Sequence, residues 1–201
     1  MNPPMVNSSD KSVQQQAEVQ EAKRRAENAK KAKETADQLF PNEKWVQVEN
    51  GIYISSRRNL DETVSKNELR DAQILRNSGS TVYLVPHFSR SKTTQYDAIA
   101  NGMKMELKNV NGNPGSLESA FLKSRSQAPN AFFNLENSNM TRSEAVAALY
   151  RARNSVTRTE KNGKVRKGYA ELNEFKGGRV ILKLKDYQNM IYLNVDDLKA
   201  H

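Results

Sequence analysis

Two observations predict an α+β fold for this chain of 201 residues. Alternating apolar positions flank the Asn-Gly pairs at 50–51 and 101–102, which is the pattern of β-hairpins with two-residue turns, and a basic hairpin is predicted around the third Asn-Gly pair at 162–163. Stretches without Gly or Pro lie among them and carry apolar residues at helical spacing. From 66 to 135 the predicted order is helix, three strands, helix and strand. We therefore predict a mixed α/β core of the type αβββαβ, with an N-terminal helix before it and a C-terminal helix plus strands after it.

A long helix is predicted from Val13 to Phe40, because this stretch consists of strong helix formers. A heptad-like stripe along it consists mostly of Ala and so buries little area. We interpret residues 1–40 as a polar tail followed by a helical stalk or linker, and self-association or docking through this helix is the alternative. Residues 41–201 then form the globular domain.

The elements after Pro41 follow from periodicity and turn residues. Thr141-Arg-Ser-Glu144 forms a capping box, which opens a helix that runs through Arg153. The other predicted elements are a hairpin around 50–51, a helix at 67–78, a strand at 81–85, a hairpin around 101–102, a helix at 116–127, a strand at 130–135, a basic hairpin around 162–163, and strands at 179–185 and 190–195.

Composition excludes several classes of function. The chain has no Cys, which rules out disulfides, Cys-based zinc sites, iron–sulfur clusters and a thiol nucleophile. Its two His, His87 and His201, cannot form a three-His metal site. No apolar run approaches the ~18 residues of a spanning helix and no signal peptide is evident, so we expect a soluble, cytoplasmic protein without a membrane span. The 32 Lys and Arg exceed the 23 Asp and Glu, and the net charge of +9 favours a polyanionic partner.

The turn at 101–102 fixes the pairing of its two strands. Paired residue numbers then sum to 203, which places Asp97 directly opposite Glu106, with Lys108 on the same face. Two opposed carboxylates have Cβ atoms ~5 Å apart and cost stability unless a cation lies between them. Their oxygens suit Mg²⁺ or Mn²⁺. We therefore predict a metal site for phosphodiester hydrolysis, with Lys108 stabilising the developing phosphoryl charge. A hairpin with one charged, solvated face is the alternative.

The order of these elements, with Asp97 and Glu106-Leu107-Lys108, resembles the PD-(D/E)xK nuclease superfamily, which has a restriction-endonuclease-like core. The resemblance implies that Asp97 and Glu106 bind Mg²⁺ or Mn²⁺ and that Lys108 is catalytic. It also implies that Glu68 on the first helix assists the metal or the water, and that Gln127 at the end of the second helix orients the substrate. The sequence departs from the pattern at the residue before Asp97, which is not Pro.

Within that superfamily, residues 66–135 look like the C-terminal tRNA nuclease domains of contact-dependent growth inhibition toxins. This resemblance implies an RNA substrate such as tRNA, an immunity protein as partner, and delivery from or attachment to a larger toxin, phage or mobile-element assembly. A DNA endonuclease of the same fold is an alternative. A non-catalytic nucleic-acid-binding or structural protein of a phage or mobile element is another. A metal-free ribonuclease would need a Glu with His87 as its partner, and we rank it last.

Basic residues after the predicted catalytic hairpin form a candidate nucleic-acid-binding surface. Residues 142–185 contain twelve Lys and Arg against four Asp and Glu, the strongest local asymmetry in the chain. Such side chains can follow a phosphate backbone, and a merely solvated basic hairpin is the alternative. Aromatic residues at 45, 88, 96, 150 and 169 could stack on bases, although we expect most of them in the core. The predicted nucleic-acid-binding residues are Lys123, Arg125, Arg151, Arg153, Arg158, Lys164, Arg166 and Lys167.

Overall fold

The structure is a computed structural model that describes residues 8–58, 62–86, 96–172, 175 and 177–198. It confirms the α+β class. The helices are α1 (Ser8–Leu39), α2 (Thr63–Asn77), α3 (Pro114–Ser124), α4 (Arg142–Arg153), α5 (Tyr169–Leu172) and the 3-10 helix η1 (Val195–Leu198). The strands are β1 (Trp45–Glu49), β2 (Ile52–Ser55), β3 (Val82–Leu84), β4 (Ala98–Ala100), β5 (Met103–Asn109), β6 (Asn130–Leu135), β7 (Arg158–Thr159), β8 (Val165–Arg166), β9 (Arg179–Leu184) and β10 (Ile191–Asn194).

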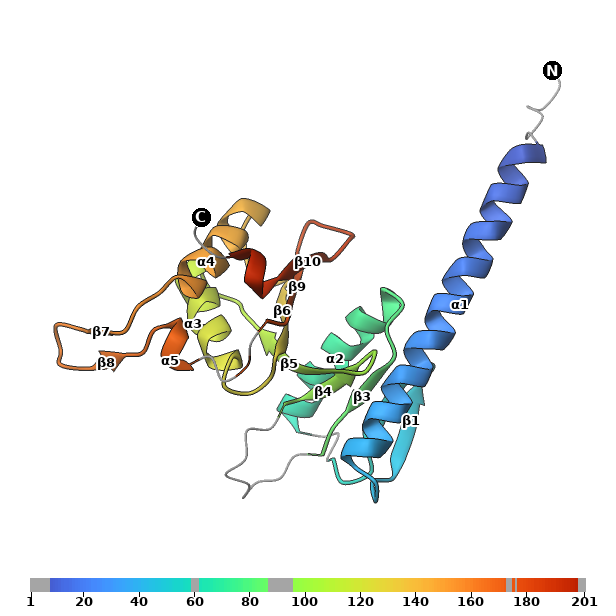
Figure 1. Ribbon diagram of the computed structural model, residues 1–201, viewed down its shortest axis with the longest axis horizontal. Coiled ribbons are helices and arrows are strands. Elements are labelled where there is room, and N and C mark those ends of the chain that lie inside the picture. The colour runs from blue at the N-terminus through green and yellow to red at the C-terminus, as the bar shows by residue number, and fades with distance from the viewer. Residues whose placement is uncertain (1–7, 59–61, 87–95, 173–174, 176, 199–201) are drawn as a thin grey trace.

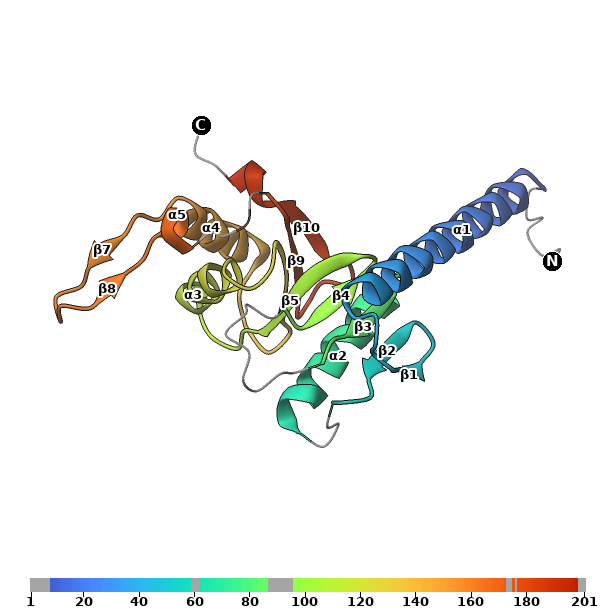
Figure 2. The ribbon, with the colours of Figure 1, turned by 60° about the horizontal axis from the view of Figure 1, so that its bottom comes forward.

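Eight strands form one mixed sheet in the order β1-β2-β3-β4-β5-β6-β9-β10, and β7 and β8 form a separate two-stranded ribbon. The pairs β2–β3, β5–β6 and β6–β9 are parallel, and the others are antiparallel. Parallel neighbours require crossover connections. Helix α2 supplies the first and α3 the second, while α4, the β7–β8 ribbon and α5 lie between β6 and β9. The ribbon and the N-terminal end of α1 project from opposite ends of the molecule (Figures 1 and 2).

Apolar side chains cover both faces of the sheet. Under α2, Leu75 packs with Leu84, Met105 and Leu107, among others. The opposite face carries two separate cores. One lies beneath the C-terminal turns of α1, and its buried members are Ala32, Ala36, Tyr83, Val85 and Ile99. The other lies beneath α3 and α4 and includes Leu117, Phe121, Phe133, Leu149 and Leu182. Strand β5 lies between these two cores. On the face opposite α2, its residues lie where neither α1 nor the pair α3 and α4 covers the sheet completely.

The hairpin around Asn101 and Gly102 has the predicted two-residue turn, whereas β1–β2 contains a register shift and the pairs of β7–β8 sum to 324 and not to the 325 of a two-residue turn. Asn101 and Gly102 have φ angles of 50° and 82°, the left-handed pair that a two-residue type I′ turn requires. Ala98 pairs with Met105 and Ala100 with Met103, as the sum of 203 predicts. The capping box at Thr141 and Glu144 is present as well. Helix α2 begins four residues earlier than predicted, and the sequence patterns did not indicate the two four-residue elements α5 and η1.

Helix α1 differs from a simple stalk. Its first part is solvent-exposed, with Val13 and Val19 each 65% exposed, and it projects from the body (Figure 1). Its last turns belong to the globular core, because Ala32 and Ala36 are fully buried against the sheet. The Asn28 amide also donates a hydrogen bond to the Gly79 carbonyl (3.2 Å). The globular unit therefore begins within α1 and not at Pro41.

Candidate active site

Asp97 and Glu106 lie side by side at the end of the β4–β5 hairpin. The Asp97 N–H donates to the Met105 carbonyl (3.1 Å), and Asp97 Oδ2 accepts a hydrogen bond from the Leu107 N–H (2.8 Å). Asp97 thus contacts β5 on both sides of Glu106. Glu106 is paired in parallel register with Ala131 of β6, whose side chain lies in the core under α3 and α4. Glu106 therefore faces the side of the sheet opposite α2, where it is fully buried and not on the solvated face that was the alternative.

Glu106 is fully buried, and its surroundings oppose ionisation. Burial raises the pKa of Glu106, and the nearby charge of Asp97 raises it further. Lys108 partly offsets this, because its ammonium forms an ion pair with Glu106 Oε1. Glu106 Oε2 is also buried and has no hydrogen-bond partner among the described residues. Two adjacent carboxylates with an unsatisfied buried oxygen form an electron-rich site that a cation would stabilise.

The pair Asp97 and Glu106 suits a cation such as Mg²⁺ or Mn²⁺, which keeps water ligands, better than a cation whose ligands all come from protein side chains. Among the described residues, no three His, Asp or Glu converge into a metal-binding group. Mg²⁺ commonly uses only one or two carboxylates and completes its shell with water and substrate phosphate. Asp97 and Glu106 supply two, and Oε2 of Glu106 has no hydrogen-bond donor among the described residues.

Lys108 connects the acid pair to a cleft of about 760 Å³. Its side chain is 30% exposed, and it lines the cleft while it contacts Glu106. Predicted residues from three other places in the sequence line the same cleft: Lys123 of α3, Gln127 just after it, and Arg166 of β8. The structure therefore places Lys108 and Gln127 on the same cleft. The cleft lining among the described residues includes neither Asp97 nor Glu106, and Glu106 reaches the cleft only through its contact with Lys108.

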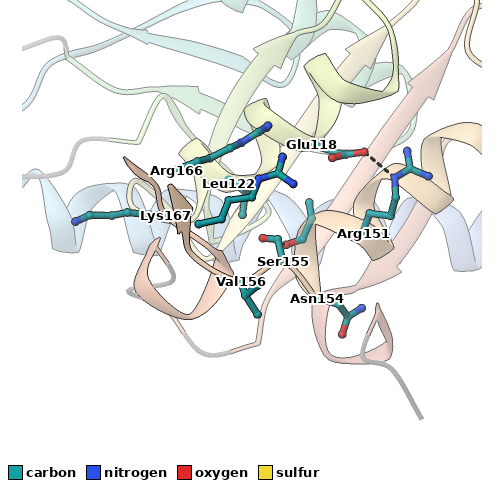
Figure 3. Close-up of a pocket in the computed structure, with 10 residues that line it drawn as sticks. Glu118, Leu122, Arg151, Asn154, Ser155, Val156, Arg166 and Lys167 are labelled. Carbon is teal, nitrogen blue, oxygen red and sulfur yellow. Dashed lines mark hydrogen bonds and ion pairs between the residues drawn. The ribbon is translucent and has the colours of Figure 1, made fainter. Parts of the chain in front are cut away.

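A second cavity of about 310 Å³ adjoins the cleft at the base of the ribbon (Figure 3). The predicted basic residues Arg151, Arg158, Arg166 and Lys167 line it. Glu118 and Arg166 line both cavities, so the two cavities adjoin at these residues. Figure 3 shows Glu118 and Arg151 directed toward each other, and their ion pair measures 2.8 Å. Sequence reasoning missed Glu118, an acid without a distinguishing motif.

The ribbon holds two arginines opposite each other. Arg158 pairs with Arg166 across β7 and β8, and like charges in directly opposed positions are destabilising. Arg166 donates a hydrogen bond to the Ser119 hydroxyl (3.0 Å), which ties the ribbon to α3. Lys164 is exposed beyond this pair, near the ribbon's tip. A bound polyanion would relieve this repulsion.

Arg125 is not available to nucleic acid, and its predicted role as a nucleic-acid-binding residue is wrong. It is 1% exposed and points into the protein. Its guanidinium donates hydrogen bonds to the carbonyls of Pro129 (2.6 Å), Phe175 (2.9 Å) and Gly177 (2.7 Å). Arg153 is partly buried, with its guanidinium 4.1 Å from the centre of the Tyr169 ring. Both arginines therefore stabilise the segment around α5.

Glu68 also lies in a different setting from the one predicted. It is buried on α2 and forms an ion pair with Arg58, a residue that sequence reasoning did not single out. The Arg58 guanidinium also donates hydrogen bonds to the carbonyls of Val85 and of Asp97 (2.9 Å). Glu68 is thus linked to Asp97 through Arg58. Arg58 comes from the polar stretch after β2, where no periodicity or motif marks it.

Most of the candidate stacking aromatics belong to the core, as expected. Trp45 and Tyr96 pack around Phe40, and Tyr169 stacks on Phe121 at 5.9 Å. Tyr150 is 43% exposed. His87, His201 and Phe88 lie outside the described residues. Within the part of the chain that the structure describes, no helix has the length and apolar character needed to cross a membrane.

Comparison with known proteins finds a weak structural likeness. No protein-family model and no curated protein matches the chain. Among solved structures, a "CdiA-CT/CdiI toxin and immunity complex from Burkholderia pseudomallei" is similar, with 21% sequence identity and a TM-score of 0.42. The similarity covers 66% of this chain and 88% of that chain. Values this low carry no inference about activity.

Proposed function

We propose that this protein is a metal-dependent endonuclease that hydrolyses phosphodiester bonds in RNA. The observation that carries the proposal is the adjacent acids Asp97, which is half-buried, and Glu106, which is fully buried, with Lys108 connecting Glu106 to a cleft lined with basic residues. Acidic side chains beside a cationic groove suit a reaction in which the substrate is a polyanion and the reacting centre needs a cation.

Asp97 and Glu106 would hold Mg²⁺ or Mn²⁺, which supplies an activated water and polarises the phosphoryl oxygens. Lys108 has a flexible stem and three donor hydrogens, so it can turn from Glu106 toward a phosphate in the cleft. There it would stabilise the negative charge that develops on the oxygens of the pentavalent phosphoryl group. Gln127 lines the same cleft and would orient the substrate through its amide.

The groove beyond Lys108 would hold the strand on one side of the cleaved bond. Lys123 and Arg166 lie next to the proposed reaction centre, and the second cavity continues this basic surface along the ribbon. Phosphate contacts of this kind position a nucleic acid without reading its sequence. We favour tRNA among RNAs, and an immunity protein as partner, because residues 66–135 resemble toxin nuclease domains. Both remain parts of the proposal, as does action in the cytoplasm after delivery from a larger assembly.

The test incubates the protein with total tRNA and with plasmid DNA in parallel, in Mg²⁺ and in EDTA. We expect cleavage of tRNA in Mg²⁺ only, and no cleavage by the variants Asp97→Asn and Glu106→Gln. Asp186→Asn, at an exposed acid outside the site, is the matched control and should remain active. Cleavage of plasmid alone would change the substrate to DNA. Full activity of Asp97→Asn would overturn the assignment, and salt-sensitive binding without metal-dependent cleavage would favour a non-catalytic binding protein.

A further inference from the structure

Arg58 is a buried arginine that donates a hydrogen bond to the main chain of Asp97. Its side chain is 1% exposed, and its guanidinium contacts Glu68 of α2 and two main-chain carbonyls, those of Val85 and Asp97. Burying a guanidinium is costly unless its donors are satisfied. Here one guanidinium connects α2, the end of β3 and the start of β4.

The two carbonyls lie at the ends of the segment that joins β3 to β4. Val85 directly follows β3, and Asp97 directly precedes β4. The Val85 N–H also donates to the Asp97 carbonyl (3.1 Å), so this oxygen accepts two hydrogen bonds. With the Asp97 N–H bonded to Met105, three interactions fix the main chain at the residue that carries the first acid. The position of the Asp97 carboxylate follows from this main chain, because its side chain is short.

We propose that Arg58 is a positioning residue for the metal site and that Glu68 acts through Arg58. This inference rests on the proposed function. Glu68 orients the guanidinium, the guanidinium holds the main chain of Asp97, and Asp97 then lies against Glu106. The role differs from direct assistance by Glu68 to the metal, which the resemblance implies. It predicts that Glu68 and Arg58 variants share one phenotype, distinct from that of Asp97 variants.

The first experiment measures Mn²⁺ binding to the full chain by calorimetry, without substrate, for wild type, Arg58→Lys, Glu68→Gln and the double variant. We expect each single variant to raise the Kd for Mn²⁺ about 10- to 100-fold, as loss of an outer support for a metal ligand does. The double variant should be no weaker than the weaker single variant, because the two residues act in one chain of contacts. Asp97→Asn should abolish binding.

The second experiment measures RNA cleavage as a function of Mg²⁺. Arg58→Lys and Glu68→Gln should lower kcat with little change in KM for RNA, and high Mg²⁺ should restore part of the rate. The control is Arg125→Lys, because Arg125 is also a buried arginine with three hydrogen-bond acceptors, but these are three carbonyls at the segment around α5. This control should lose stability and keep the wild-type Kd for Mn²⁺ per folded molecule.

Several results would overturn the inference. One is a wild-type Kd and kcat for folded Arg58→Lys, and another is an equal loss of Mn²⁺ affinity in Arg125→Lys. A third is Glu68→Gln that abolishes Mn²⁺ binding as Asp97→Asn does, since Glu68 would then be a direct ligand. If Arg58→Lys does not fold, Glu68→Gln decides alone. A Kd for Mn²⁺ above that of wild type supports the inference, and a Kd equal to that of wild type overturns it. A wild-type protein that binds no Mn²⁺ and cleaves no RNA would refute the proposed function together with this inference.

Discussion

The Leu107 N–H donates a hydrogen bond to the Asp97 carboxylate (2.8 Å), so this side chain takes the place of a main-chain acceptor for a residue of β5. This bond lies one residue from Glu106 and one from Lys108, the two other members of the proposed catalytic group. The Asp97 carboxylate is therefore fixed by β5, the strand that carries Glu106, and its side chain has little freedom to move away from Glu106. A site of this kind is preorganised by main-chain geometry.

Lys108 is expected to act on the chemical step more than on binding. Lys108→Met removes the ammonium and keeps the stem, and we expect kcat for RNA cleavage to fall about 100- to 1,000-fold, because a charge at the transition state is lost. Single-turnover cleavage at saturating RNA measures this effect. The matched control is Lys66→Met, an exposed lysine on α2, which should cleave at the wild-type rate. Equal rates for both variants would remove Lys108 from the mechanism.

RNA affinity should depend on salt, because the basic residues that line the two cavities are expected to bind phosphates. In an inactive Asp97→Asn background, Arg158→Gln and Arg166→Gln should each weaken RNA binding and reduce the slope of log K against log salt by about 0.7, the value for one phosphate contact on a single strand. Fluorescence anisotropy over a salt series measures both quantities. Lys30→Gln, on the exposed part of α1, should change neither. An unchanged slope in the ribbon variants would place the substrate elsewhere.

Arg125 should affect stability and not affinity. Arg125→Met leaves the carbonyls of Pro129, Phe175 and Gly177 without their donor, and hydrogen bonds from a charged group contribute about 1.5–3 kcal/mol each. We expect the free energy of unfolding in urea to fall by about 3 kcal/mol or more. RNA affinity per folded molecule should stay at the wild-type value. A variant of wild-type stability with weakened RNA binding would contradict the buried role.

Asp71 should make stability depend on pH. This fully buried carboxylate on α2 accepts hydrogen bonds from Asn109 and Asn134 (both 2.8 Å), but burial outweighs them and raises its pKa to about 7. Between about pH 4 and pH 7 the unfolded chain has lost the proton that the folded protein keeps. The contribution of Asp71 to the free energy of unfolding therefore falls as pH rises through this range and stays constant above it.

Urea unfolding at several pH values tests this relationship. Asp71→Asn has no proton to lose, so its advantage over wild type, whatever its value at pH 4, should increase up to about pH 7. The difference between the two proteins isolates Asp71 from Glu106, whose raised pKa acts with the same sign in both. Parallel curves for wild type and Asp71→Asn would show that Asp71 titrates normally.

The sequence predicted the parts of the fold that local rules determine. An Asn-Gly turn fixes register, so the pairing of Ala98 with Met105 and of Ala100 with Met103 follows from the order of the residues alone, whereas the Asp97 N–H bonds to the Met105 carbonyl and departs from that register. Arg125 shows where such rules end. Charge grouped it with Lys123 in sequence, yet α3 ends at Ser124 and Arg125 turns inward to carbonyls about fifty positions away. Arg58 was missed for the same reason, because only the assembled sheet brings Glu68, Val85 and Asp97 to it.

The placement of α1 has a consequence for anything joined to its N-terminal side. An uninterrupted helix of 32 residues is about 48 Å long, and roughly the first 30 Å of α1 lies outside the globular core. Its last turns are anchored behind Ile99, two residues from Asp97. For any domain joined to that end, the helix would be a rigid spacer of fixed length between the domain and the proposed catalytic cleft. Inserting or deleting whole turns in its exposed part would change that distance and leave the core untouched.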